Sequence, residues 1–185
     1  MSVIEFIGTA RAGKTTIARA LEKSYPGVIY YPERHDLIPK KLKDDVFEYN
    51  LWYAKYCIEQ LQQALGKPGL HLFERGVIDH IIIGEAHFKM GWFKKRQLDQ
   101  YLSLLMPLVD KNDLTFVFKI PVDVSLERAE AMGKDVTRAV PYMKTLSYLY
   151  GQIHKLVPDA VFLPENISLI DMEKLVVEKM KLLNL

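Results

Sequence analysis

The segment Gly8-Thr9-Ala10-Arg11-Ala12-Gly13-Lys14-Thr15-Thr16 matches the pattern G-x-x-x-x-G-K-[ST] and decides the fold. An apolar run, residues 3–7, comes directly before it, and a helical pattern follows over residues 13–24. Glycines let the backbone curl so that successive N–H groups point inward at phosphate oxygens. The helix that follows directs its positive N-terminal end at the same anion. Strand, loop and helix together predict a phosphate-binding loop.

Two side chains of this loop have specific expected roles. Lys14 supplies a mobile cation for the β- and γ-phosphates, and we expect it to be catalytic. Thr15 offers a hydroxyl to Mg²⁺, which prefers oxygen ligands and phosphate. The predicted ligand is therefore a nucleoside triphosphate with Mg²⁺. We expect the whole loop to contact it: Gly8, Thr9, Ala10, Arg11, Ala12, Gly13, Lys14, Thr15 and Thr16.

Short apolar runs alternate with amphipathic stretches along the rest of the chain. This alternation predicts a parallel α/β sheet that is covered by helices on both faces, in one domain of residues 1–185. Ligands of such sheets bind beyond the carboxyl ends of the strands. The further strands are expected over residues 28–31, 70–73, 114–120 and 161–163. The further helices are expected over residues 44–65, 79–89, 94–109, 122–132, 141–156 and from a capping box at Ser168 and Asp171 to about residue 183.

Composition limits the class of protein. Apolar residues make up 49% of the 185 residues, which indicates a globular chain with a substantial core. The formal net charge of +2 argues against a broad nucleic-acid surface. The single cysteine, Cys57, suits a reducing compartment and argues against a cysteine metal site. The sequence shows neither a signal peptide nor a membrane span, so we expect a soluble cytoplasmic protein without a membrane partner.

Acidic residues follow two of the predicted strands. Glu33 comes after the second strand, and Glu74 comes after the third, with Arg75 beside it. Parallel strands end at the same edge of the sheet, so both carboxylates should lie near the phosphate loop. The apolar run that ends at Glu74 resembles a Walker B segment, whose acid lies close to the metal. We expect Arg75 to stabilise the charge of a transferred phosphoryl group.

Neighbouring polar residues carry weaker predictions. Arg34, His35 and Asp36 follow Glu33, and a solvated loop is the expectation for them, although one could face an acceptor. Asp79 and His80 lie one turn into the helix after the third strand. Asp79 could reach an acceptor cavity, but helix capping or a solvated face explains it equally well.

A basic segment follows the fourth predicted strand. Arg128, Lys134 and Arg138 cluster around Gly133, which predicts a lid at about residues 132–140. A lid that closes over a nucleotide excludes water and stabilises charge in the transition state. Arg128 is the member that we expect to be catalytic, and a solvated helix end is the alternative.

These motifs together resemble the thymidylate kinase and deoxynucleoside kinase branch of P-loop kinases. The resemblance extends over most of the chain: the loop 8–15, Glu33 beside a proline, the long helix 44–65, residues 68–79 with Phe73-Glu74-Arg75-Gly76, residues 121–133 and the aromatic helix 142–150. It implies the three-layer P-loop NTPase fold, with five parallel strands in the order 2-3-1-4-5, ATP as donor and Mg²⁺ as cofactor.

The resemblance also implies roles for individual residues. Glu33 would be the base for an acceptor hydroxyl, Glu74 would serve the metal, and Arg75 would serve the acceptor or the transferred phosphate. The acceptor would lie against the long helix, although core packing is the alternative for its aromatic residues. The side chains that would line it are Phe47, Tyr49, Asn50, Trp52 and Tyr53.

The chain departs from the family pattern at several positions. Pro32-Glu33 reverses the usual Glu-Pro, Gly76 stands where the family has serine or tyrosine, and Met132-Gly133-Lys134 replaces an Arg-Gly-Arg lid. The long helix has no glutamine placed clearly for base recognition, which leaves Glu48 or Asn50 as loose candidates.

The leading hypothesis is an ATP-dependent phosphotransferase that acts on a nucleoside, a nucleotide or a similar small molecule. A kinase of a non-nucleoside compound and a nucleotide-binding regulatory module with little turnover are the alternatives. A nucleic-acid end kinase is disfavoured by the balanced charge, and a homodimer stays open.

Overall fold

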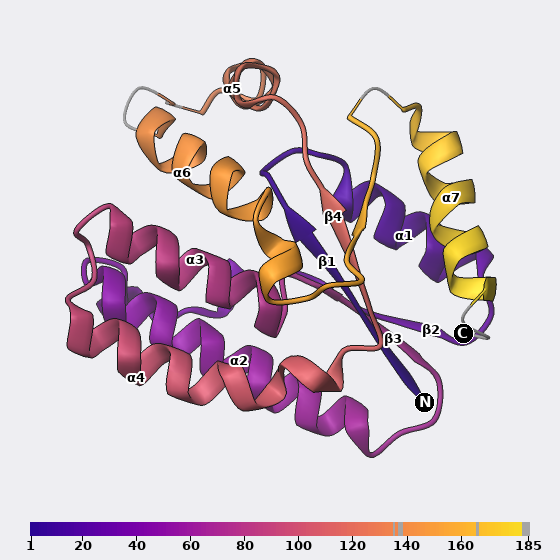
Figure 1. Cartoon of the computed structure of the whole chain (residues 1–185), viewed down its shortest axis with the longest axis horizontal. Coiled ribbons are helices and arrows are strands. Elements are labelled where there is room, and N and C mark those ends of the chain that lie inside the picture. The colour runs from indigo at the N-terminus through magenta and orange to yellow at the C-terminus, as the bar shows by residue number, and fades with distance from the viewer. Residues whose placement is uncertain (135, 137–138, 166, 183–185) are drawn as a thin grey trace.

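A computed structural model describes residues 1–134, 136, 139–165 and 167–182. Five parallel strands form one sheet in the order β2-β3-β1-β4-β5, which confirms the predicted fold class and strand order. The strands point toward the end of the molecule where α5 lies (Figure 1). Their bounds are β1 (Ser2–Gly8), β2 (Val28–Tyr31), β3 (Leu70–Glu74), β4 (Leu114–Phe118) and β5 (Val161–Phe162).

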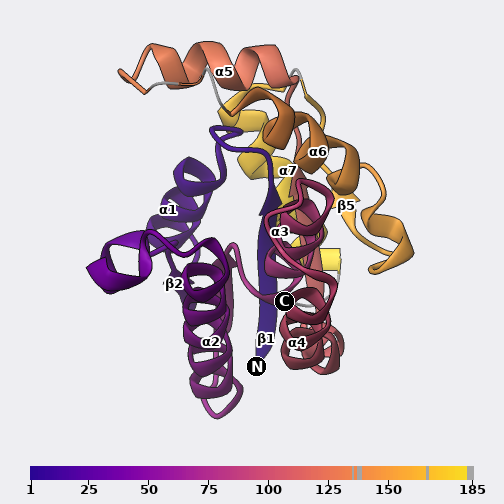
Figure 2. The same ribbon diagram turned by 90° about the vertical axis from the view of Figure 1, so that its left-hand side faces the viewer.

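Helices cover both faces of this sheet. On one face, α1 and α7 pack on Ile4, Phe6 and Phe116. On the other face, α2, α3, α4 and α6 pack on alternate strand residues such as Val3 and Val117. Figures 1 and 2 show α2, α3 and α4 side by side on this second face. The helices are α1 (Lys14–Ser24), α2 (Val46–Leu65), α3 (Val77–Lys89), α4 (Lys95–Leu105), α5 (Val122–Glu130), α6 (Val140–Tyr150) and α7 (Leu169–Leu182).

Two helix starts follow local capping chemistry. The carboxylate of Asp45 accepts hydrogen bonds from the backbone N–H groups of Phe47 and Glu48 at 2.9 and 3.0 Å, so α2 begins two residues later than expected. The predicted cap at the last helix is confirmed, because Ser168 Oγ accepts from the N–H of Asp171 at 3.1 Å. Short polar side chains therefore set these boundaries.

Other elements are shorter than the sequence pattern predicts. β4 stops at Phe118, not at residue 120, because its neighbour β1 turns away after Gly8, the residue paired with Phe118. α4 ends at Leu105, where Pro107 cannot donate a backbone hydrogen bond, and the chain continues as a 3₁₀ helix (Met106–Lys111). The helix expected to 156 ends at Tyr150, before the 3₁₀ turn Ile153–Lys155.

The predicted lid is described only in part. The chain forms a turn at residues 131–133, and α6 begins at Val140. Arg138 lies outside the described residues. Among the helices of the described chain, none is long and apolar enough to cross a membrane.

The junction of β1 and the phosphate loop depends on a close backbone approach. Gly8 has φ of +125°, and a Cβ built on it would lie 2.0 Å from the carbonyl oxygen of Phe118. Any side chain would therefore push β4 away from β1. The first glycine of the motif is required for packing of the sheet as well as for the turn.

We expect Gly8→Ala to lower the free energy of unfolding by more than about 3 kcal/mol, because steric overlap adds to left-handed strain. Gly91→Ala is the matched control, since Gly91 has φ of +74° but nothing within 4 Å of a Cβ. The control should lose only about 1–2 kcal/mol. Urea denaturation measures both variants, and equal losses would contradict the close-approach argument.

Candidate active site

The phosphate loop presents a row of free backbone donors. Among the described residues, the N–H groups of residues 10–16 donate to no protein acceptor. Gly13 has φ of +99° and Arg11 has φ of +59°, which turn the loop around an open concavity. A cavity of about 610 Å³ lies against this loop and reaches Glu74 and Arg128. The concave row of donors fits an anion such as a polyphosphate, as the motif predicts.

Lys14 lies at the base of this cavity. It is 4% exposed, and its Nζ donates to the carbonyl oxygens of Gly8 at 3.1 Å and Thr9 at 2.7 Å. Burial and the nearby Arg75 lower its pKa to about 7, against the opposing effect of surrounding carboxylates. A phosphate in the cavity would reverse this effect, because an anion favours the charged amine.

Thr15 and Glu74 meet as predicted. Thr15 Oγ1 donates to Glu74 Oε1 at 2.5 Å, and the hydroxyl of Tyr30 donates to the other carboxylate oxygen. A hydroxyl and a carboxylate beside a phosphate cradle are the hard oxygen ligands that suit Mg²⁺. The described residues contain no group of three acidic, histidine or cysteine side chains that could hold a metal alone. This donor set fits a cation that also binds phosphate and water, and it does not form a complete protein cage.

Arg75 joins the carboxylates that follow β2 and β3. Its Nε lies 3.0 Å from Glu33 Oε1, and its Nη1 lies 2.6 Å from Asp79 Oδ2. Burial alone would lower the pKa of Arg75, but Asp79 and Glu33 raise it well above the ordinary value. The guanidinium therefore stays charged and holds the two carboxylates in place.

Asp79 ties this cluster to the phosphate loop. It is fully buried and accepts hydrogen bonds from the N–H of Gly8 at 3.2 Å and the hydroxyl of Tyr150 at 2.8 Å. Of the alternatives that the sequence left open for Asp79, the solvated face is therefore excluded. A helical position one turn after β3 does not by itself reveal that the side chain turns back under the loop.

A buried carboxylate that the sequence argument missed supports α3. Glu5 is fully buried in β1 and accepts from the N–H groups of Ile78 and Asp79 at 3.0 and 2.8 Å. Burial raises its pKa to about 8, although these N–H donors oppose the shift. A Cβ at Gly76 would lie 2.9 Å from the Glu5 carboxyl carbon, so a side chain there would displace the Glu5 carboxylate. The alternating strand pattern could have flagged Glu5 as an acid on a buried face.

Glu33 has a second partner besides Arg75, the imidazole of His35. His35 Nε2 lies 2.5 Å from its Oε1, and the hydroxyl of Tyr49 lies 2.7 Å from His35 Nδ1. Burial would raise the pKa of Glu33, but Arg75, His35 and Lys14 lower it to about 2. Glu33 is therefore ionised throughout the neutral range. The neighbouring pair of Arg34 and Asp36 is exposed, as expected.

Arg128 reaches the phosphate loop from α5. Its Nη1 donates to the carbonyl oxygen of Arg11 at 2.8 Å, and its side chain lines the loop cavity. Ser125 of the same helix donates to the carbonyl oxygen of Ala10 at 2.8 Å. α5 lies across the loop in both views (Figures 1 and 2). The catalytic role of Arg128 stays a prediction, but its position beside the loop matches it.

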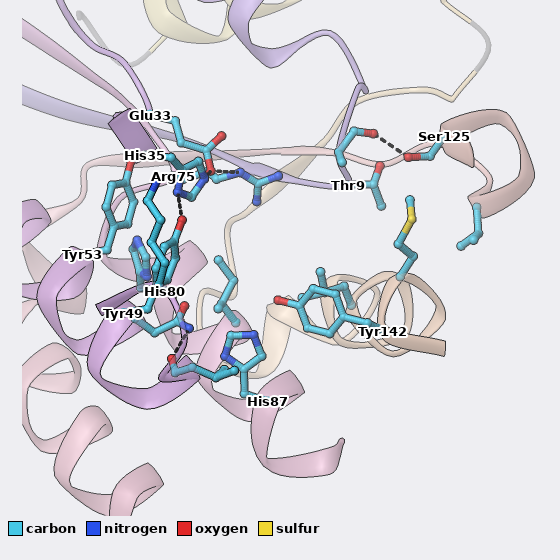
Figure 3. Close-up of a pocket in the computed structure, with 18 residues that line it drawn as sticks. Thr9, Glu33, His35, Tyr49, Tyr53, Arg75, His80, His87, Ser125 and Tyr142 are labelled. Atoms are coloured by element: carbon cyan, nitrogen blue, oxygen red, sulfur yellow. Dashed lines mark hydrogen bonds and ion pairs between the residues drawn. The ribbon is translucent and has the colours of Figure 1, made fainter. Parts of the chain in front are cut away.

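A second cavity, of about 410 Å³, opens next to the first. Glu33 and Arg75 line both cavities. Figure 3 shows these two at one side, with Tyr142 on another wall and His87 opposite. The further lining residues used below are His35, Lys43, Tyr49, Asn50, Tyr53, His80, Ile83 and Ser125.

The long helix contributes only some of the predicted residues. Tyr49, Asn50 and Tyr53 line the second cavity. Phe47 instead packs edge-on against Phe93 in the core, and Trp52 stacks on Tyr56. For these two the alternative of packing outside the acceptor site holds, because they point to other sides of α2 than Tyr49 and Tyr53, which are four residues apart and share one side.

Glu48 does not line the second cavity, so Asn50 is the better placed of the two candidates for base recognition. Three further lining residues were missed or weakly weighted: His80, His87 and Tyr142. Only their spacing along helices could have signalled them.

The architecture is shared with solved nucleoside and nucleotide kinases that have a phosphate-binding loop. Deoxyadenosine kinase from M. mycoides with products dCMP and a flexible dCDP bound superposes with a TM-score of 0.77 at 16% identity, covering 97% of this chain and 98% of that one. The same enzyme with bound dATP gives 0.76 at 19% identity, covering 98% and 100%.

Thymidylate kinase from Candida albicans superposes with a TM-score of 0.78 at 16% identity, covering 99% of this chain and 92% of that one. No protein-family model and no curated protein sequence matches the chain. At these identities the comparisons establish a common fold over the whole described length, and the chemistry must be argued from this chain's residues.

Glu33 should give stability a specific pH dependence. Because its pKa falls from 4.5 to about 2 on folding, its contribution is complete above pH 4.5 and is lost as the pH falls toward 2. We expect the difference in unfolding free energy between the wild type and Glu33→Gln to shrink by roughly 2–3 kcal/mol over that interval. Urea denaturation at several pH values measures it.

Glu59→Gln is the matched control, on an exposed carboxylate of α2. Its difference from the wild type should stay small at every pH. A Glu33→Gln difference that is constant from pH 6 to pH 3 would contradict the ion pair with Arg75.

Proposed function

We propose that this protein transfers a phosphoryl group from ATP to a hydroxyl group of a nucleoside, assisted by Mg²⁺. The observation that carries the proposal is the meeting of two cavities at Glu33 and Arg75. One cavity has the loop amides and Lys14 of an anion site, and the other has aromatic and amide side chains that suit a nucleoside. Transfer between two bound molecules needs this adjacency.

On the donor side, free loop N–H groups and Lys14 would bind the β- and γ-phosphates. Arg128, already bonded to the loop at Arg11, would add charge from the α5 side. Thr15 and Glu74 would hold Mg²⁺, which neutralises charge that develops on the phosphates. Tyr30 keeps the Glu74 carboxylate turned toward Thr15.

On the acceptor side, Glu33 would accept a hydrogen bond from the hydroxyl that is phosphorylated. With a pKa of about 2, Glu33 is a weak base, so orienting this hydroxyl is its main role. Phosphoryl transfer needs little proton abstraction early in its loose transition state, so positioning and electrostatics suffice. Arg75 holds Glu33 at 3.0 Å and adds positive charge near the transferred group.

The charges of the acceptor cavity favour a nucleoside over a nucleotide. Glu33 is ionised there, and Arg75 is already neutralised by Glu33 and Asp79. Lys43 is the remaining charged basic side chain among the described lining residues. The phosphate of a nucleotide acceptor would be repelled by the Glu33 carboxylate, and no uncommitted arginine among the described lining residues would bind it. A neutral hydroxyl group meets no such repulsion.

We expect Lys14→Ala to reduce acceptor-dependent release of ADP from ATP by roughly 100-fold or more, because it removes a charge aimed at the transferred group. Lys55→Ala, on an exposed position of α2, is the control and should retain the wild-type rate. Lys14→Ala transferring phosphate at the wild-type rate would contradict the proposal.

Nucleosides should be better acceptors than their 5′-monophosphates. We expect kcat/KM to favour the nucleosides by at least tenfold in a panel of purine and pyrimidine compounds, measured as ADP release and as phosphorylated product. Preference for the monophosphates would reject the nucleoside assignment. ATP binding without turnover on any acceptor would instead favour a regulatory nucleotide-binding module.

A further inference from the structure

One face of α3 brings two histidines to the acceptor cavity. His80, Ile83 and His87 are three and four residues apart, so they lie on the same side of the helix, and all three line the cavity. His80 is 2% exposed and His87 is 6% exposed. Both therefore lie where a bound acceptor, and not bulk water, would contact them.

Each of these imidazoles has a buried nitrogen without a partner among the described residues. The atoms are His80 Nε2 and His87 Nδ1. Buried polar atoms are normally paired, because leaving one unpaired costs free energy. Both histidines also line one cavity, so a molecule bound there is the candidate partner for these two nitrogens.

The hydrogen bond between Tyr101 and His80 determines which nitrogen of His80 carries the proton. The hydroxyl of Tyr101 lies 2.8 Å from His80 Nδ1, its one hydrogen-bond partner among the described residues. Burial raises the pKa of Tyr101 well above its ordinary value, so this hydroxyl keeps its proton. Because Nδ1 is its one partner among the described residues, the buried O–H is satisfied only when it donates a hydrogen bond to Nδ1. Burial lowers the pKa of His80 to about 4, so the ring is neutral. His80 must then carry its proton on Nε2, on the side of the ring away from Tyr101.

Gly84 makes this arrangement possible. A Cβ at Gly84 would lie 2.7 Å from Cδ1 of Tyr101, which is fully buried. The absence of a side chain lets the phenol ring lie directly on α3, one turn beyond His80. The tautomer of His80 is therefore built into the packing of α3 against α4.

Asn50 offers the complementary group from α2. Its Nδ2 donates to the carbonyl oxygen of Val46 at 2.7 Å, which leaves the amide oxygen to accept a hydrogen bond. His87 stacks against Tyr142 at 5.2 Å between ring centroids, so its ring is held in one plane. The cavity thus combines a fixed donor at His80 with an acceptor at Asn50.

We propose that His80 recognises the heterocycle of the nucleoside acceptor by donating from Nε2 to a ring nitrogen, with Asn50 accepting from an adjacent amino group. The inference rests on the proposed function and specifies how that site reads its substrate. The preferred class is an uncharged base whose edge places a hydrogen-bond acceptor next to a donor. Tyr101 is a positioning residue, because it acts only through His80.

Deaza analogues test this donor directly. The probes are 2′-deoxycytidine with its 3-deaza analogue, and 2′-deoxyadenosine with its 1-deaza and 7-deaza analogues, with dissociation constants from calorimetry. For the nucleoside that binds best, we expect one deaza analogue to bind about tenfold or more weakly to the wild type. His80→Phe should weaken the parent nucleoside to the level of that analogue and leave the analogue nearly unchanged.

Two further variants complete the test. Tyr101→Phe keeps the volume but removes the hydroxyl, so it should reduce the discrimination between parent and analogue severalfold, whereas a purely structural role would weaken both compounds equally. His154→Phe changes an exposed histidine outside the cavity and should preserve the wild-type discrimination. Retained ATP binding in each variant shows that the fold is intact.

The outcomes separate the two proposals. If nucleosides are phosphorylated but His80→Phe and Tyr101→Phe both keep the wild-type ratio of parent to analogue, the role of His80 is wrong and the proposed function stands. If the wild type neither binds nor phosphorylates any nucleoside of the panel, the proposed function fails, and this inference fails with it.

Discussion

The placement of Arg75 between two carboxylates is the interaction on which the rest of the site depends. Its guanidinium contacts Glu33 after β2 and Asp79 on α3. Asp79 extends the connection to the phosphate loop through the N–H of Gly8, and to α6 through Tyr150. Because a buried charge is costly unless it is paired and hydrogen-bonded, these partners constrain one another. One cation therefore holds both cavities at a common edge of the sheet.

The same pairing shapes the chemistry on each side of Arg75. It keeps Glu33 ionised but weakly basic, which suits orientation of an acceptor hydroxyl more than proton abstraction. The two carboxylates also neutralise the charge of Arg75 on the side of the acceptor cavity. The other end of that cavity is lined by the uncharged imidazoles of His80 and His87 and by the amide of Asn50. Among the described residues, the loop N–H groups and Lys14 contact no carboxylate, and they face the donor cavity. The site thus separates a strongly anion-binding half from a nearly neutral half.

Much of this arrangement could be predicted because it depends on local pattern and sheet direction. The motif Gly8–Thr16 specifies the loop, and parallel strands bring Glu33 and Glu74 to its side. Asp79 and the aromatic residues of α2 were harder to predict, because the direction of a helical side chain depends on how the helix docks. Phe47 turned into the core while Tyr49 faced the cavity; helical spacing puts the two on opposite sides of α2 but does not say which side faces the cavity.

The sequence by itself determined the strand–loop–helix unit, the parallel sheet and the acids at its edge, because glycine conformations, capping groups and apolar runs act over a few neighbouring residues. Only the tertiary structure decided that the Glu5 carboxylate packs directly against Gly76, and that Tyr101 contacts His80. These features join residues distant along the chain, and they depend on ångström-scale packing between elements. Hydrogen-bond partners and pKa values follow from that packing, so they could not be read from sequence spacing.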